Sequence, residues 1–211
     1  MTGIIHFEAF LLAGILLNLT PGNDTIFILA KSMGQGRKAG IVSALGIGTG
    51  SIVHTIFAAC GLSFIIARSI LLFNIIKYAG VLYFLYMGVK MFIGKSRLNS
   101  GDPLVNNKQK HLGIYRAAVI TNVLNPKVAL FFIAFLPQFI DPDFKNAVLP
   151  FLLLGITFVF TGTAWCLILA VFAATISGKL SSNRKIAATI NKFCGAVLIA
   201  LGIKVAFIDG K

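Results

Sequence analysis

The chain has 211 residues, of which 57% are hydrophobic and 12% are charged, and its net charge is +13. About a quarter of the residues of a soluble domain are charged, so the composition excludes a soluble globular protein and indicates an integral membrane protein. Such a basic balance suggests nucleic-acid binding in a soluble protein. This chain has no soluble domain for that role, and no nucleic-acid partner is expected.

Six apolar stretches are long enough to cross a membrane as helices. A bilayer core is about 30 Å thick, and a helix needs roughly 20 residues to cross it. The predicted fold class is therefore all-α, an integral membrane bundle of six transmembrane helices surrounded by lipid. The stretches are residues 4–29, 41–66, 70–92, 114–139, 147–176 and 186–208.

The first span is interrupted at residues 20–24, Thr-Pro-Gly-Asn-Asp. Pro21 removes a backbone donor and frees carbonyl groups, and such backbone persists in hydrocarbon only where protein or a watery cavity covers it. Asp24 is the only carboxylate well inside a predicted span, which favours a role in binding substrate or a proton. The alternative is a helix cap, because Asp is favoured where a helix restarts. Since the span lacks a basic leader, we expect no cleaved signal peptide.

The second span combines small residues with a histidine. Gly46 and Gly50 are four residues apart, the spacing that lets two helices pack closely. His54 follows on the same span and is a candidate for relaying protons near neutral pH. A structural histidine held by a hydrogen bond is the alternative.

A polar segment, residues 94–113, separates the third and fourth spans. Its Asn, Ser, Gly, Asp and Pro residues are typical of a loop, and we expect a cytosolic linker.

The fourth span is interrupted at residues 125–127, Asn-Pro-Lys. Lys127 places a cation inside this span, and a buried ammonium needs a partner such as Asp24 or the carboxylate of a substrate. The alternative is that Lys127 extends along the helix to the cytosolic interface.

Both interruptions also create helix N-termini, whose free amides and positive dipole attract a carboxylate. Neutral polar side chains flank them, although polar helix packing would explain the asparagines equally well. The predicted residues for substrate binding and proton coupling are Asn18, Thr20, Pro21, Gly22, Asp24, His54, Asn122, Asn125, Pro126 and Lys127.

The fifth and sixth spans repeat features of the second and third. Residues 77–80, Lys-Tyr-Ala-Gly, correspond to residues 192–195, Lys-Phe-Cys-Gly, and the Thr-Gly pair at 49–50 corresponds to that at 161–162. Three spans are an odd number, so the second copy is inverted, a common plan of secondary transporters. Chance similarity among apolar segments is the alternative. The predicted organisation is a first three-helix repeat at 1–93, the linker at 94–113 and an inverted repeat at 114–211.

Most basic residues fall in the loops on one side of this arrangement. Because basic loops stay cytosolic, both chain termini are predicted to lie outside the cytosol. The predicted cytosolic set is Lys31, Arg37, Lys38, Lys90, Lys95, Arg97, Lys108, Lys110, Arg116, Lys179, Arg184, Lys185 and Lys192, and the opposite set is Arg68, Lys77, Lys145, Lys204 and Lys211.

The sequence offers no sign of enzymatic chemistry. It has no Walker loop, nucleophile elbow, zinc-type spacing or dinucleotide fingerprint, so neither catalysis nor a cofactor is expected. Cys60, Cys166 and Cys194 lie within apolar stretches, where buried packing is the favoured interpretation over redox chemistry or metal binding.

Together these motifs resemble the LysE/RhtB family of amino-acid exporters across nearly the whole chain. The resemblance is closer to the homoserine and threonine exporter branch than to the lysine and arginine exporters. Asn23 stands where many members have a second proline. The motifs are residues 20–22, Gly36, Gly40, Gly46, Gly50, residues 77–80, residues 125–127 and residues 135–139, Phe-Leu-Pro-Gln-Phe.

The resemblance implies export of small neutral amino acids or related metabolites across a bacterial cytoplasmic membrane by proton antiport. Its partners would be the amino acid, protons and lipid, and the sequence leaves open whether the chain forms a homo-oligomer. Two alternatives remain: an exporter of another cargo, such as a metal cation, and a non-transporting subunit or channel.

Overall fold

The computed structural model of the protein describes residues 2–62, 70–93, 109–141, 144, 148–182 and 184–207. Within these residues every regular element is a helix, apart from one antiparallel bridge between Ile4 and Ile140. The predicted all-α class is confirmed. The helices are α1 (Phe7–Leu19), α2 (Asn23–Gln35), α3 (Arg37–Phe57), η1 (Ala58–Leu62), α5 (Ile70–Ile93), α6 (His111–Val123), α7 (Pro126–Leu130), η3 (Phe131–Phe135), η4 (Leu136–Phe139), α8 (Val148–Ser182) and α9 (Arg184–Phe207).

Two pairs of helices are bent where the sequence places its prolines. Helices α1 and α2 meet at 48°, and α6 meets the helical segment 126–139 at 45°. Gly22 precedes α2 in an extended conformation, and Pro126 occupies the first turn of α7, where its missing amide costs no helical hydrogen bond. Asn125 caps α7 by accepting a hydrogen bond from the Lys127 amide at 3.1 Å.

Several described helices are long and apolar enough to cross a membrane. Residues 37–61 and 148–173 meet this test as single helices, and each bent pair meets it when counted as one span. Helices α5 and α9 have 24 residues each and occupy the predicted third and sixth spans. A helix of that length extends about 36 Å, which is enough for the bilayer core.

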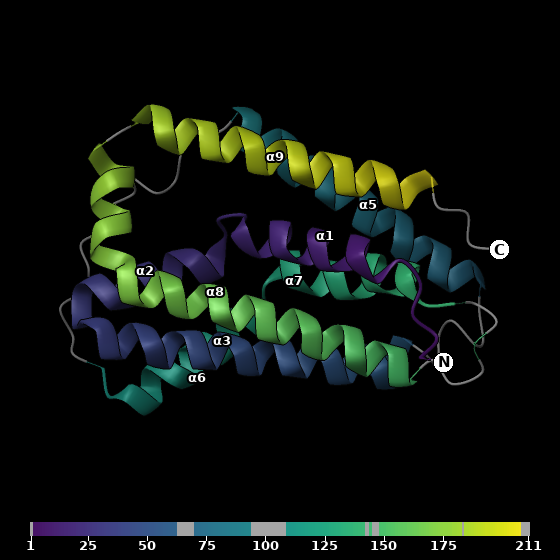
Figure 1. Cartoon of the computed structure of the whole chain (residues 1–211), viewed down its shortest axis with the longest axis horizontal. Helices are drawn as coiled ribbons and strands as arrows, with labels where there is room; N and C mark the ends of the chain where they lie inside the picture. The colour runs from purple at the N-terminus through teal and green to yellow at the C-terminus, as the bar shows by residue number, and fades with distance from the viewer. Residues whose placement is uncertain are drawn as a thin grey trace.

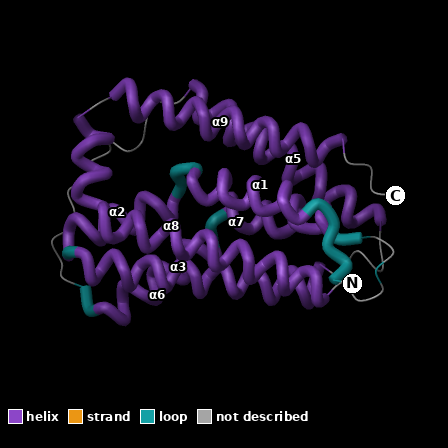
Figure 2. Tube along the Cα trace, viewed as in Figure 1, coloured by secondary structure: helices purple, strands orange, loops and turns teal. Residues whose placement is uncertain are grey.

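The helices form three layers (Figure 1). Helix α9 lies along α5, helices α3, α6 and α8 pack together on the opposite side, and α1 and α7 run between them. Figure 2 shows the short loops that separate α1 from α2 and α6 from α7 inside this arrangement. The two breaks therefore lie in the middle of the bundle, where Thr20, Asn125 and Lys127 are buried and Pro126 is exposed.

Phenylalanines fill the core between α1, α8 and the segment that follows α7. Phe131 stacks on Phe158 with ring centroids 4.7 Å apart and on Phe135 at 5.1 Å. Phe10 packs against Phe131, and Phe132 meets Phe158 edge to face. All five side chains are buried. This cluster fixes the position of η3, which continues α7, against α1 and α8.

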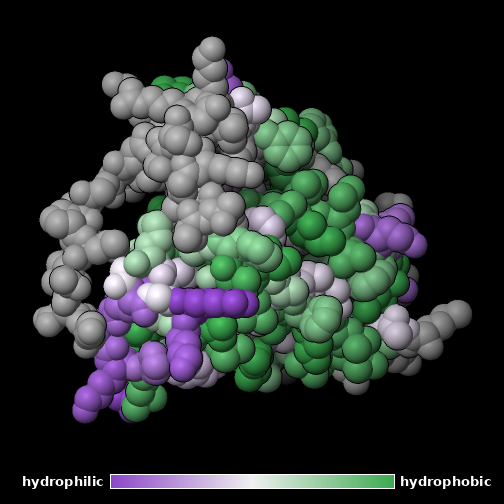
Figure 3. Space-filling model, turned by 60° about the vertical axis from the view of Figure 1, so that its left-hand side comes forward, coloured by the Kyte–Doolittle hydropathy of each residue, from purple (hydrophilic) through white to green (hydrophobic). Residues whose placement is uncertain are grey.

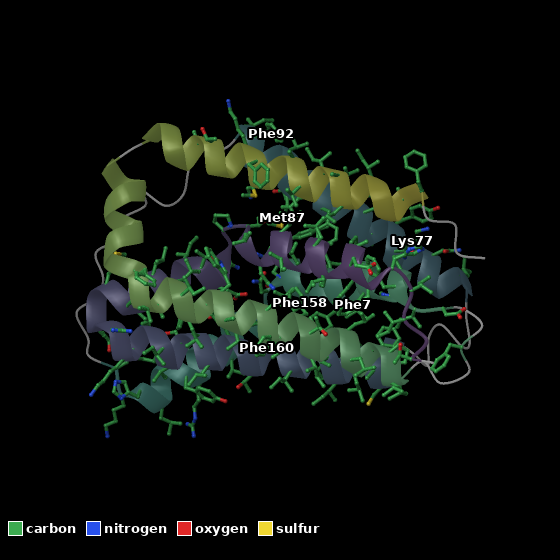
Figure 4. The ribbon with its side chains drawn as sticks, in the orientation of Figure 1. Phe7, Lys77, Met87, Phe92, Phe158 and Phe160 are labelled. Atoms are coloured by element: carbon green, nitrogen blue, oxygen red, sulfur yellow. The ribbon has the colours of Figure 1, made fainter. Side chains whose placement is uncertain are left out.

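The outside of the bundle is mostly apolar. Phe160 is 75% exposed, whereas Phe158, two residues earlier on α8, is 3% exposed (both labelled in Figure 4). Figure 3 shows a largely hydrophobic face, with most of its hydrophilic residues gathered at the lower left and a smaller group at the right. Arg37, Lys38 and Lys110 are exposed where α3 and α6 begin, at the left of Figure 1. An apolar belt with basic residues at one end suits a membrane protein.

Some predictions fall partly outside the described residues. Of the predicted linker, residues 94–108 are not described, and α6 begins at His111. Cys166 is buried as predicted, and the Cys194 side chain is not described. The prediction of buried packing is wrong for Cys60, which is exposed because this turn of η1 faces the outside of the bundle. The inverted repeat stays a prediction.

Candidate functional site

The two helix breaks lie against each other through Lys127. Its Nζ donates hydrogen bonds to the carbonyl oxygens of Thr20, at 2.9 Å, and Leu17, at 3.2 Å. The side chain is 6% exposed, and a Cβ placed on Gly22 would lie 3.4 Å from Nζ. Lys127 therefore reaches across to the first break instead of extending to the interface.

The position of the ammonium follows from the end of α1. The last carbonyls of a helix have no partner within the helix and carry partial negative charge, so a cation is stabilised there. The sequence predicted a carboxylate as the partner of Lys127. The hydrogen bonds described for it go to backbone carbonyls, because α1 ends directly beside it, and a carboxylate partner stays a prediction.

Asp24 connects the first break to the second. Its Oδ2 accepts hydrogen bonds from the side-chain amides of Asn122, at 2.9 Å, and Asn125, at 3.0 Å. Although Asp24 lies in the first turn of α2, the cap of this helix is Gly22, and no side chain caps it. The carboxylate thus binds α6 and the loop before α7, which is a tertiary contact between two distant parts of the chain.

Asn122 is the centre of a polar network. Its side-chain oxygen accepts from Ser51 Oγ at 3.2 Å, and its carbonyl oxygen lies 3.1 Å from His54 Nε2. His54 also stacks on Phe132, with ring centroids 5.6 Å apart. A Cβ on Gly50 would lie 2.7 Å from the Asn122 side chain, so glycine at this position lets α6 approach α3.

The remaining predicted residues differ in what they contribute. Asn18 donates to Thr161 Oγ1 at 3.4 Å. The Thr20 hydroxyl donates to the Leu16 carbonyl one turn back, so Thr20 meets Lys127 through its carbonyl only. Pro21 is half-buried and Pro126 is exposed. The prolines shape the breaks, while the polar contacts come from their neighbours.

A small cavity lies where these helices meet. It measures about 20 Å³, which is room for about one water molecule, so a larger solute requires its walls to move. Helices α1, α2, α3, α6, α7 and α8 all contribute to it. The lining residues are Asn18, Asp24, Thr25, Ile47, Gly48, Ser51, Asn122, Lys127, Val128, Phe158, Gly162, Thr163, Trp165 and Cys166.

Comparison with known proteins assigns the chain to a family. The model of the LysE type translocator family matches residues 15–208. The chain belongs to the LysE type translocator family. No solved structure matches it.

Relatives of this translocator cover nearly its whole length. It is 27% identical to a leucine efflux protein of Salmonella typhimurium over 97% of this chain and 96% of that protein. It is 28% identical to a leucine efflux protein of an Enterobacter species, with the same coverage of each chain. It is 30% identical to the uncharacterized membrane protein YrhP of Bacillus subtilis, over 93% of this chain and 96% of that protein. These matches support an amino-acid exporter in a membrane and a transporter rather than an enzyme.

The translocator also has buried or partly buried polar residues that the sequence did not single out as site residues. Ser51, Thr163 and Trp165 line the cavity. The Thr-Gly pair at 161–162, directly before Thr163, was used above only as a mark of the repeat. Its single tryptophan, inside an apolar span, was an available signal. Lys77 of α5 (Figure 4) is 2% exposed, with Nζ 5.3 Å from the centre of the Tyr78 ring.

Proposed function

We propose that this translocator is a secondary active exporter that moves neutral amino acids out of the cytosol in exchange for protons. The observation that carries the proposal is the cavity at the two helix breaks, which presents one carboxylate, Asp24, and one ammonium, Lys127. An amino acid carries the complementary pair, an ammonium and a carboxylate on one carbon. A site with one charge of each sign suits such a zwitterion.

The cavity walls favour a neutral side chain on the substrate. Ile47, Val128 and Phe158 contribute apolar surface, and Asp24 and Lys127 are the only acidic and basic residues in the lining. An exporter of lysine or arginine would need a further carboxylate for the side-chain cation. The leucine efflux relatives agree with an apolar amino acid, and we propose leucine, threonine and homoserine as the first substrates to test.

Asp24 is the proposed site of proton exchange. In its ionised form Asp24 would bind the substrate's ammonium while the substrate moves outward. After the substrate leaves, Asp24 would take up a proton, and the empty site would then open again to the cytosol and release that proton there. Each cycle then moves one neutral substrate out and one proton in. A charge crossing about 150 mV yields roughly 3.5 kcal/mol, which sustains an outward gradient of a few hundredfold without nucleotide hydrolysis.

Uptake into everted membrane vesicles tests the function. We expect labelled leucine to accumulate in vesicles that contain the protein and to leave when an uncoupler collapses the proton gradient. The Asp24→Asn variant should lose this uncoupler-sensitive uptake, because an amide cannot exchange a proton. Glu8→Gln is the matched control, since Glu8 is exposed at the start of α1 and does not line the cavity.

Two outcomes would contradict the proposal. Full uncoupler-sensitive uptake by Asp24→Asn would remove the proton role from this residue. An amino-acid flux that never exceeds equilibrium and is insensitive to the uncoupler would instead identify a channel.

A further inference from the structure

Three polar atoms in the cavity are buried and have no hydrogen-bond partner within the described part of the chain. They are Asp24 Oδ1 on α2, and Thr163 Oγ1 and Trp165 Nε1 on α8. All three residues line the same cavity. Buried polar groups are almost always paired, so several unpaired atoms around one space indicate a ligand that pairs them.

Thr163 differs from the threonines that precede it on α8. Thr157 Oγ1 donates to the Leu153 carbonyl at 2.8 Å, and Thr161 Oγ1 donates to the Thr157 carbonyl at 3.0 Å. This back-bonding to the preceding turn is the usual way in which a helix satisfies a threonine hydroxyl in an apolar setting. Thr163 makes no such bond. Its hydroxyl is therefore available to a molecule in the cavity.

The chemistry of the three atoms selects the kind of partner that each requires. The indole N–H of Trp165 only donates, so it needs an acceptor such as a carboxylate oxygen. An ionised Asp24 only accepts, so its Oδ1 needs a donor such as an ammonium. The Thr163 hydroxyl serves either group. An α-amino acid presents a donor and an acceptor of these kinds, its ammonium and its carboxylate, on the same carbon.

The backbone around these atoms is also unusually close. A Cβ on Gly48 of α3 would lie 2.5 Å from Thr163 Oγ1, and one on Gly162 would lie 3.1 Å from Asn18 Oδ1. Because Gly48 and Gly162 have no side chains, they leave the Thr163 hydroxyl and the Asn18 amide uncovered. Any larger residue at Gly48 would occupy the space in front of Thr163.

From these observations, and resting on the export function proposed above, we infer that α8 supplies part of the substrate site. Trp165 Nε1 binds the carboxylate of the transported amino acid, Asp24 Oδ1 binds its ammonium, and Thr163 Oγ1 completes the contacts. Trp165 and Thr163 are thus specificity residues for the zwitterionic headgroup, and the apolar part of the cavity receives the side chain.

Two conservative substitutions test the inference, because each removes a polar group and keeps the shape. Trp165→Phe removes the N–H, and Thr163→Val removes the hydroxyl. We expect each to raise the inhibition constant of unlabelled leucine, measured against labelled leucine uptake, by roughly tenfold, the effect of losing a hydrogen bond to a charged group. The matched controls are Phe160→Leu and Thr157→Val, which change residues on α8 outside the cavity lining.

A second competitor separates a carboxylate contact from a general loss of binding. Isoamylamine has the side chain and ammonium of leucine but no carboxylate. Trp165→Phe should weaken inhibition by leucine and leave inhibition by isoamylamine unchanged. Equal losses for both compounds, or no loss for either, would overturn the role of Trp165. The second result is also the one expected if the three atoms only bind a water molecule.

Tryptophan emission gives a readout that does not depend on transport. The chain has a single tryptophan, so the emission of the purified protein reports Trp165 alone. We expect leucine to change this emission saturably and isoamylamine to change it less. If either variant fails to fold, as judged by gel filtration, this titration of the unsubstituted protein decides the inference, and an emission that leucine leaves unchanged overturns it.

The two proposals fail in different ways. Saturable leucine binding without uncoupler-sensitive uptake would retain the binding site and contradict the export function. Uncoupler-sensitive uptake with unaltered leucine inhibition in both variants would retain export and contradict the assignment of α8.

Discussion

At the scale of single residues, the site depends on how two charges are accommodated in an apolar bundle. A charge at the centre of a membrane helix costs about 3 kcal/mol or more, so each needs polar neighbours. Lys127 finds carbonyls at the end of α1, and Asp24 finds the amides of Asn122 and Asn125. Each charge thus binds groups from the other half of the chain, and the two breaks hold each other in place.

Replacing Lys127 with methionine should weaken this connection. The substitution keeps the length of the side chain but leaves the carbonyls of Leu17 and Thr20 without the ammonium, which costs about 1–3 kcal/mol for a buried unpaired acceptor. We expect a lower midpoint of thermal unfolding in detergent. Lys90→Met is the control, because Lys90 is exposed and donates to Tyr86 on its own helix. Equal midpoints for the two variants would show that the Lys127 contacts do not support the fold.

At the scale of helices, close packing depends on glycines that face a neighbouring backbone. A Cβ on Gly46 of α3 would lie 2.6 Å from the Tyr115 carbonyl oxygen and 2.7 Å from the Ala118 Cβ on α6. Neither atom is the end of a flexible side chain, so α6 itself would have to move. This contact places Asn122, one turn beyond Ala118, beside Ser51 and His54.

Gly46→Ala should therefore destabilise the protein, by about 1–3 kcal/mol as expected for overpacking. Gly113→Ala on α6 is the opposite case, because nothing lies within 4 Å of its added Cβ. Alanine favours a helix over glycine by up to about 1 kcal/mol, so this change should stabilise slightly. The measurement is the midpoint of thermal unfolding of each variant, compared with that of the unsubstituted protein in the same detergent. Shifts in the same direction would contradict this account of α3 and α6.

At the scale of the whole molecule, the exposed basic side chains of the described residues lie toward one end of the bundle. Arg37, Lys38 and Lys110 are exposed where α3 and α6 begin, and the N-terminus lies at the opposite end (Figure 1). Since basic loops stay in the cytosol, this asymmetry agrees with the predicted placement of the N-terminus outside the cytosol. Residues 208–211 lie outside the described part of the chain, and the position of the C-terminus stays a prediction.

Cysteine accessibility in intact cells checks that orientation. In a background without Cys60, Cys166 and Cys194, a membrane-impermeant thiol reagent should label Thr2→Cys and leave Lys110→Cys unlabelled. Both positions are exposed in the structure, so both should react once the cells are permeabilised. Labelling of Lys110→Cys alone in intact cells would mean that the protein is inserted the other way round.

Much of the architecture can be predicted from local features of the sequence. The lengths of the apolar stretches indicate the helices, and the prolines at 21 and 126 locate the breaks, because a proline acts on the backbone of its own turn. The π-helical turns η1 and η3 contain no proline, and the sequence therefore did not predict them. The hydrogen-bond partners of Lys127 were also not predictable. They are backbone carbonyl oxygens at a helix end, which every residue has whatever its side chain, so no residue type in the sequence marks them.

The sequence by itself determined the membrane class, the two breaks and the residues of opposite charge beside them, because apolar length and helix-breaking residues act locally. Only the tertiary structure decided that Asp24 binds Asn122 and Asn125, and that α8 turns Thr163 and Trp165 into the same cavity. A membrane helix is apolar on all sides, so its sequence pattern does not reveal which face is turned inward. Which face of a helix is turned inward depends on where glycines let a neighbouring helix approach closely, as Gly46 does for α3 and α6.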